Sequence, residues 1–106
     1  MDISKIYRTN KESISINTRI PENLYIEYKK ISLETNYPFN GLILFAMNYA
    51  LKDTEKKSYK TSKTDIAINL RIPKETHTEY KRLKNNLNRS INSLIISAMY
   101  YFLENN

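Results

Sequence analysis

The chain carries one polar motif twice, and its residue types suit recognition of nucleic acid bases. Residues 17–21 read Asn-Thr-Arg-Ile-Pro, and residues 69–73 read Asn-Leu-Arg-Ile-Pro. An arginine side chain can donate two hydrogen bonds to guanine O6 and N7, and an asparagine can bridge N6 and N7 of adenine. Each such contact contributes about 1–3 kcal/mol of discrimination between bases. The recurrence of Asn-x-Arg-x-Pro therefore favours base recognition over a merely solvated surface.

The two motifs belong to a longer internal repeat. Residues 13–54 align with residues 65–106 without a gap, and 17 of the 42 aligned pairs are identical. Each copy is too small to bury a core of its own, so we expect both copies to fold on each other as one unit. Around them, residues 1–12 form an N-terminal arm, and the polar, basic residues 55–64 form a linker.

Each repeat begins with a predicted strand. Apolar and polar residues alternate over 13–20 and again over 65–72, which is typical of a short strand with one buried face. Both strands run into a proline, Pro21 or Pro73. Proline suits the first turn of a helix, so we expect these residues at the first helical position.

Two helices follow the strand in each repeat. The first spans about 21–34 in repeat 1, and the chain is expected to break at 36–38 and at 86–89. Ser90 is a suitable N-cap for the last helix, whereas Pro38 in the equivalent place predicts a slightly different start. The second helices, about 39–51 and 91–103, are apolar nearly all round, which indicates that they are surrounded by protein. The apolar stripes of the first helices comprise Leu24, Tyr28, Ile31, Thr76, Tyr80, Leu83 and Leu87.

The order of elements predicts how the repeats combine. A single strand must pair with another strand, and the only equivalent one lies in the other repeat. The sequence therefore predicts a mainly α-helical fold with a two-stranded ribbon, in the order β-α-α-β-α-α.

Composition excludes several classes of function. The chain has no Cys, one Gly and a single histidine, His77. We therefore expect no enzyme, no metal site and no cofactor, since thiol catalysis, Cys-ligated metals and glycine-rich phosphate loops are all absent. No apolar run approaches membrane-spanning length, and residues 1–13 lack the core of a signal peptide, so a cytoplasmic location is expected. The net charge of +6 favours nucleic acid or an acidic surface as the partner.

The strand, the Arg-Ile-Pro sequence and the two helices joined by a short Asn/Ser turn resemble the ribbon-helix-helix family of bacterial and phage DNA-binding proteins, of the Arc, MetJ and CopG type. Residues 68–95 are particularly similar to the Arc type, in Asn-x-Arg-x-Pro and in Asn-Arg-Ser-x-Asn-Ser. Members of the family usually form homodimers. Here the resemblance implies a dimer fused into one chain, as in the TraY-type relaxosome proteins.

The resemblance implies that the strands pair antiparallel, that the four helices lie behind them, and that the exposed ribbon face enters the major groove. Carried over position by position, it assigns base-reading and phosphate-contacting roles. The base-reading residues are Ser15, Asn17, Arg19, Ala67, Asn69 and Arg71. The phosphate-contacting residues are Asn40, Gly41, Arg89, Ser90, Asn92 and Ser93. Because Ser15 is replaced by Ala67, we expect a double-stranded DNA site that is an imperfect palindrome.

Three functions remain open at this point. The first is a transcriptional repressor or regulator of a plasmid or phage. The second is a relaxosome accessory protein in plasmid transfer, and the third is a protein-binding relative of antitoxin or inhibitor type. The apolar second helices and residues 99–103 further suggest that two chains associate side by side on adjacent sites.

Overall fold

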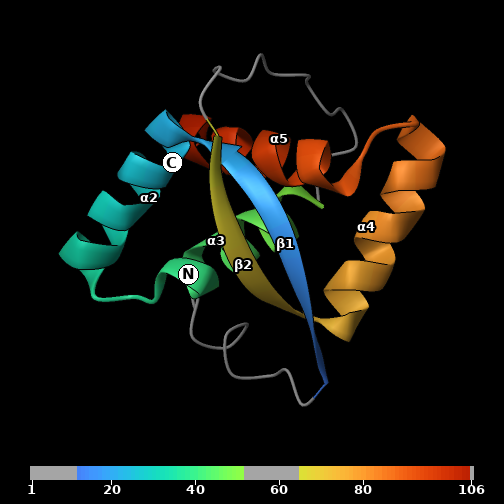
Figure 1. Ribbon diagram of the computed structural model, residues 1–106, viewed down its shortest axis with the longest axis horizontal. Helices are drawn as coiled ribbons and strands as arrows, with labels where there is room; N and C mark the ends of the chain where they lie inside the picture. The colour runs from blue at the N-terminus through green and yellow to red at the C-terminus, as the bar shows by residue number, and fades with distance from the viewer. Residues whose placement is uncertain (1–11, 52–64, 106) are drawn as a thin grey trace.

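The computed structural model describes residues 12–51 and 65–105, and six elements lie within them (Figure 1). Four helices and a two-stranded antiparallel sheet follow one another in the order β-α-α-β-α-α, which confirms the predicted order. The described ranges leave out residues 1–11 of the predicted arm, residues 52–54 at the end of repeat 1 and the whole predicted linker. The elements are β1 (Ser13–Pro21), α2 (Glu22–Thr35), α3 (Phe39–Ala50), β2 (Asp65–Pro73), α4 (Lys74–Leu87) and α5 (Ile91–Glu104).

The ribbon joins the two repeats symmetrically. β1 pairs antiparallel with β2, and Asn17 lies opposite Asn69, its equivalent in the other repeat. Four residue pairs extend the ladder on each side of this central pair. The register therefore has an approximate twofold axis that passes between Asn17 and Asn69.

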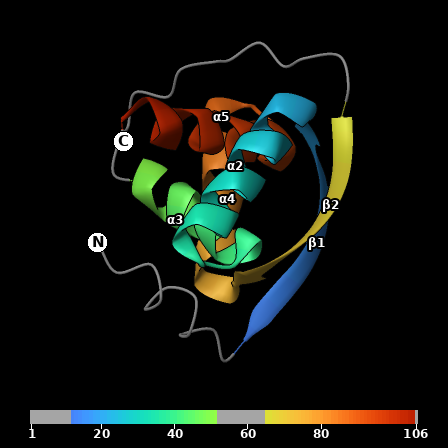
Figure 2. The ribbon, with the colours of Figure 1, turned by 90° about the vertical axis from the view of Figure 1, so that its left-hand side faces the viewer.

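All four helices lie on one side of the ribbon (Figure 2). α3 and α5 lie behind the strands, while α2 and α4 flank them on either side (Figure 1). Eight residues of α3 and seven of α5 are buried, against two each in α2 and α4, so the core sits between the ribbon and the second helix of each repeat. This confirms that the second helices are surrounded by protein. The strands contribute the buried side chains of Thr18, Ile20, Leu70 and Ile72.

Two buried tyrosines link the repeats across the core. The Tyr28 hydroxyl donates to the Met99 carbonyl at 2.8 Å, and the Tyr80 hydroxyl donates to the Met47 carbonyl at 2.7 Å. The two bonds are equivalent under the internal repeat. Burial raises the pKa of both phenols well above the ordinary value, because a phenolate would lose its hydration.

Pro21 and Pro73 lie just before the helices, one position earlier than the first helical position that the sequence predicts for them. Pro21 and Pro73 end the strands and cap the following helices, with φ near −60° and ψ of 148°. Proline fixes only φ, which is nearly the same in a helix and in an extended segment. The strand pairing at Pro21 and Pro73 sets the extended ψ, so the helices begin at Glu22 and Lys74.

Asparagine ends the first helix of each repeat. Asn36 and Asn88 have positive φ values of 65° and 55°, a region that asparagine tolerates better than most residues. The first break falls at 36–38 as the sequence predicts, whereas α4 continues through Leu87, so the second break spans 88–90 rather than 86–89. α3 and α5 begin at equivalent residues, and their starts differ only in that Pro38 provides no side-chain cap. Ser90 caps α5 as predicted, and its hydroxyl accepts a hydrogen bond from the Ser93 N–H at 3.0 Å.

The predicted apolar stripe of α4 is too long. Thr76 and Tyr80 are buried and Leu83 is half-buried, but Leu87 keeps 37% of its surface exposed. Leu87 is the last residue of α4, where the chain leaves the core at Asn88. None of the described helices is long and apolar enough to cross a membrane.

The reciprocal tyrosine bonds predict matched losses of stability. Tyr28→Phe and Tyr80→Phe each remove the partner of a buried carbonyl, which costs about 1–3 kcal/mol in the free energy of unfolding. Urea denaturation measures this loss. Tyr25→Phe, at a half-buried ring packed edge-on against Phe39, is the control and should change stability by less than about 0.5 kcal/mol. A loss confined to one of the two buried sites would contradict the reciprocal arrangement.

The raised pKa values predict alkaline destabilisation. Below pH 10 both phenols are neutral in the folded and the unfolded chain, so they add no pH dependence. Above pH 10 the unfolded chain ionises them while the folded chain does not, so stability falls as pH rises. Tyr80→Phe should reduce the fall between pH 10 and 12 by up to about 1.4 kcal/mol per pH unit relative to Tyr25→Phe. Equal slopes in the two variants would contradict the burial of Tyr80.

Candidate nucleic-acid interface

Six polar or small side chains form the face of the ribbon that points away from the helices. We call this set the outer ribbon face, and all its members are exposed. The alternation read from the sequence is confirmed, because the residues between them are buried or half-buried. The structure thus brings together every residue to which base reading was assigned. The set comprises Ser15, Asn17, Arg19, Ala67, Asn69 and Arg71.

Hydrogen bonds connect the centre of the outer ribbon face. The Ser15 hydroxyl donates to Asn69 Oδ1 at 2.9 Å, and Asn69 Nδ2 donates to Asn17 Oδ1 at 2.8 Å. Asn17 and Asn69 are direct cross-strand partners, and Ser15 reaches Asn69 diagonally. The central amides are therefore held in place before any ligand binds.

Two asparagines at the starts of the second helices hold the backbone of the motif arginines. Asn92 Oδ1 accepts from the Arg19 N–H at 2.7 Å, and Asn92 Nδ2 donates to the Arg19 carbonyl at 3.0 Å. Asn40 makes the same pair of bonds to Arg71, at 2.9 Å each. Each asparagine therefore clamps the strand of the other repeat, and the clamps occupy the outer edges of the ribbon.

The clamps fix the arginine backbone and leave the guanidinium groups available. Within residues 12–51 and 65–105, neither Arg19 nor Arg71 has a side-chain hydrogen bond or an ion pair. Because the backbone N–H and C=O of Arg19 point to Asn92, Arg19 sits at a non-hydrogen-bonded position of the antiparallel ladder. Side chains across such pairs approach most closely, so the outer ribbon face is compact.

The two clamps differ in one contact. The buried Thr18 hydroxyl also donates to Asn92 Oδ1, whereas the equivalent residue beside Asn40 is Leu70. Asn92 thus satisfies one more buried polar group than Asn40 does.

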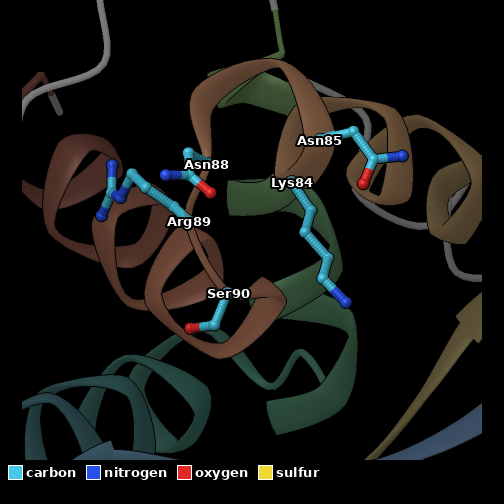
Figure 3. A pocket seen from close by; sticks show the side chains of 5 residues that line it. All are labelled: Lys84, Asn85, Asn88, Arg89 and Ser90. Carbon is cyan, nitrogen blue, oxygen red and sulfur yellow. The ribbon is translucent and has the colours of Figure 1, made fainter.

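A second polar cluster lies at the start of α5. Arg89 folds back along the helix, and its guanidinium donates to the hydroxyls of Ser93 and Ser97, both at 2.6 Å. Beside it, the surface has a depression of about 360 Å³ lined by Lys84, Asn85, Asn88, Arg89 and Ser90 (Figure 3). The guanidinium of Arg89 points away from Lys84 (Figure 3). In repeat 1 the positions equivalent to Arg89, Ser93 and Ser97 are Tyr37, Gly41 and Phe45, so this cluster is specific to repeat 2.

The predicted phosphate-contacting residues fall into two groups. Asn40 and Gly41 lie at the start of α3, and the other four lie at or just before the start of α5. The amides of Asn40 and Asn92 are committed to the strand backbone, and Gly41 is buried. Ser90 is exposed. Their contact with phosphate stays a prediction.

The structural role of Asn40 and Asn92 was not predicted from the sequence. One feature of the sequence could have indicated it: both repeats carry an asparagine at this equivalent position, just after the start of a helix. An asparagine carries both a donor and an acceptor, which a strand edge requires.

In the parts of the chain that the structure covers, no three His, Cys, Asp or Glu side chains gather as a metal site would require. Comparisons of the chain with family models, curated proteins and solved structures found no match.

Because the two clamps differ in one contact, removing each asparagine should lower the stability of the fold by a different amount. Asn40→Ala should lower the free energy of unfolding by about 1 kcal/mol, since the freed backbone groups of Arg71 can bond to water. Asn92→Ala should cost about 1–3 kcal/mol more, because it also leaves the buried Thr18 hydroxyl without its acceptor. Thermal or urea denaturation measures both. Asn86→Ala, at an exposed site of α4, is the control and should not destabilise. Equal losses for Asn40→Ala and Asn92→Ala would refute the role of Thr18.

Proposed function

We propose that this protein binds double-stranded DNA by inserting the outer ribbon face into the major groove. The observation that carries the proposal is the arrangement of Asn17, Arg19, Asn69 and Arg71, which lie on one exposed face about a twofold axis. The major groove admits a two-stranded β-ribbon and has its own approximate twofold symmetry at a palindromic site. The resemblance to the ribbon-helix-helix family supports the same mode.

The chemistry of the face suits base recognition. The guanidinium groups of Arg19 and Arg71 are unpaired among the described residues, and their backbone is fixed by the clamps. A fixed backbone lowers the conformational entropy that the main chain loses on binding. The twofold axis implies two half-sites, and the replacement of Ser15 by Ala67 makes those half-sites similar but unequal.

Phosphate contacts would come from the starts of α3 and α5. The first turn of a helix leaves backbone N–H groups without intrahelical partners, and the helix dipole favours an anion there. Asn40, Ser90 and Asn92 lie at these starts, and the amides of Asn40 and Asn92 bond to the strand edges. The linker lysines lie outside the described residues and would add salt-dependent attraction.

The biological role that fits this activity is a repressor or regulator of plasmid or phage genes, acting in the bacterial cytoplasm. A relaxosome accessory role in plasmid transfer uses the same DNA contacts and differs in the site bound. Association of two chains on adjacent sites accompanies either role. The region proposed for contact between the two chains is residues 99–103. In it, Met99 and Phe102 are buried within the chain, and Tyr101 and Leu103 are half-buried.

A protein-binding role is favoured by one observation on α2. Leu33 keeps 85% and Ile26 keeps 55% of its residue surface exposed, whereas the equivalent residues of α4 are Asn85 and Thr78. The fold therefore does not require apolar residues at these positions. The double variant Ile26→Thr/Leu33→Asn should keep its DNA affinity if DNA binding is the function of the ribbon.

The arginines provide the direct test of DNA binding. Electrophoretic mobility shifts with the DNA upstream of the protein's own gene, at two salt concentrations, should show specific binding. Arg19→Ala and Arg71→Ala should each weaken that binding by about 5- to 150-fold, the equivalent of one lost base contact. Lys81→Ala, on the exposed side of α4, removes the same charge away from the ribbon and is the matched control.

A loss as large in Lys81→Ala as in the arginine variants would show that only net charge matters. No shift of any duplex at low salt would contradict the proposed function.

A further inference from the structure

Each strand of the ribbon has an outer edge that no other strand covers within residues 12–51 and 65–105. In an antiparallel pair, alternate residues of a strand point their backbone N–H and C=O groups toward that edge. Among the described members of the outer ribbon face, only Arg19 and Arg71 have these backbone groups bonded to a side chain. The fold therefore holds the strand edges at the two arginines to which base reading was assigned.

The orientation of each clamping amide is fixed by the backbone it bonds. A backbone N–H can only donate and a carbonyl can only accept, so Asn92 Oδ1 must face the Arg19 N–H and Asn92 Nδ2 must face the Arg19 carbonyl. The same argument fixes Asn40 against Arg71. Two bonds from one amide to one residue determine both the position and the direction of the arginine backbone.

The clamps hold the ribbon near its ends. Arg19 and Arg71 each stand two residues before the proline that ends the strand. The ends of a ladder open most easily, and a two-stranded ribbon is free to twist more than a wider sheet. The clamps join these ends to α5 and α3, which are the helices with the most buried residues. The arginine backbone is thereby referred to the rigid core.

We propose that Asn92 and Asn40 are positioning residues for base reading, with Asn92 placing Arg19 and Asn40 placing Arg71 for a bidentate contact to guanine. Two parallel hydrogen bonds from one guanidinium require a defined approach, because a hydrogen bond weakens steeply when it is bent. The asparagine side chains are committed to the clamps, so they act through the arginines. The inference rests on the proposed DNA binding and deepens it.

The clamps cross from one repeat to the other. Arg19 belongs to repeat 1 and is held by Asn92 of repeat 2, while Arg71 belongs to repeat 2 and is held by Asn40 of repeat 1. A change at the clamp of one repeat should therefore alter base reading by the arginine of the other. Truncation of either asparagine leaves the backbone N–H groups of the helix starts in place, so attraction to phosphate should remain.

Double-mutant cycles test the pairing of Asn40 with Arg71. Binding is measured on the duplex that the mobility shifts identify as bound and on a shuffled duplex of the same length. Asn40→Ala should weaken binding to the specific duplex by about fivefold or more, and binding to the shuffled duplex by less than about twofold. Added to Arg71→Ala, it should weaken specific binding by less than about twofold further, whereas added to Arg19→Ala it should again cost about fivefold.

The Asn92 cycle needs a second change to protect the fold. Asn92→Ala is made together with Thr18→Val, because removing both partners of the buried bond leaves no unsatisfied hydroxyl, and Thr18→Val alone is the reference. The opposite pairing is expected, with coupling to Arg19 and none to Arg71. Asn86→Ala, at an exposed site of α4, is the matched asparagine control and should leave binding to both duplexes unchanged.

Amide hydrogen exchange of the free protein tests the clamps without DNA. In Asn40→Ala the Arg71 N–H should exchange about tenfold faster than in the wild type, because it loses its acceptor. The Arg19 N–H of the same sample should keep its rate, and it reports any general loss of stability. An unchanged rate at Arg71 would overturn the inference.

Two binding results would also overturn the inference and leave the proposed function standing. Equal weakening on the specific and the shuffled duplex by Asn40→Ala would show that the asparagine contacts phosphate instead of positioning an arginine. An equal effect of Asn40→Ala in the Arg19→Ala and Arg71→Ala backgrounds would show that the clamp does not act through Arg71. Failure of the wild type to bind any duplex would overturn the proposed function and this inference together.

Discussion

The pairing of β1 with β2 is the constraint on which the rest of the structure depends, since within residues 12–51 and 65–105 each repeat supplies one strand and the strand of the other repeat completes the ladder. The reciprocal contacts reinforce this pairing. Tyr28 and Tyr80 each bond to a carbonyl of the other repeat, and Asn40 and Asn92 each clamp the other repeat's strand edge. Because both partners lie in one chain, their pairing does not depend on protein concentration.

The same pairing produces the surface to which we assign function. An antiparallel register centred on Asn17 and Asn69 brings both copies of the Asn-x-Arg sequence to one exposed face. Fusion of two copies in one chain then allows each copy to change independently. The structure shows such changes at Ser15 against Ala67 and at the Arg89 cluster, which repeat 1 lacks. The backbone keeps its twofold symmetry, while the chemistry presented to a ligand does not.

Much of the fold was predictable because its signals are local or repeated. The alternation of apolar and polar residues located the strands, and the internal repeat supplied a partner for each strand. The position of Pro21 was missed by one residue, because proline fixes φ and strand pairing sets ψ. The clamps of Asn40 and Asn92 and the bond from Ser15 to Asn69 were not predictable, because they depend on how helices and strands of different repeats meet in space. The period of two predicted which side of the strands is exposed, and the resemblance to the ribbon-helix-helix family selected the six residues of the outer ribbon face.

The central claim is that the outer ribbon face binds double-stranded DNA. Amide chemical shifts of a nitrogen-15-labelled sample test it most directly, when they are followed during titration with a short duplex that the mobility shifts identify as bound. The account predicts the largest changes along β1 and β2 and at the first turns of α3 and α5, with little change in the middle of α2 and α4. Changes concentrated on the exposed side of α2, around Ile26 and Leu33, with the strands unaffected, would contradict it.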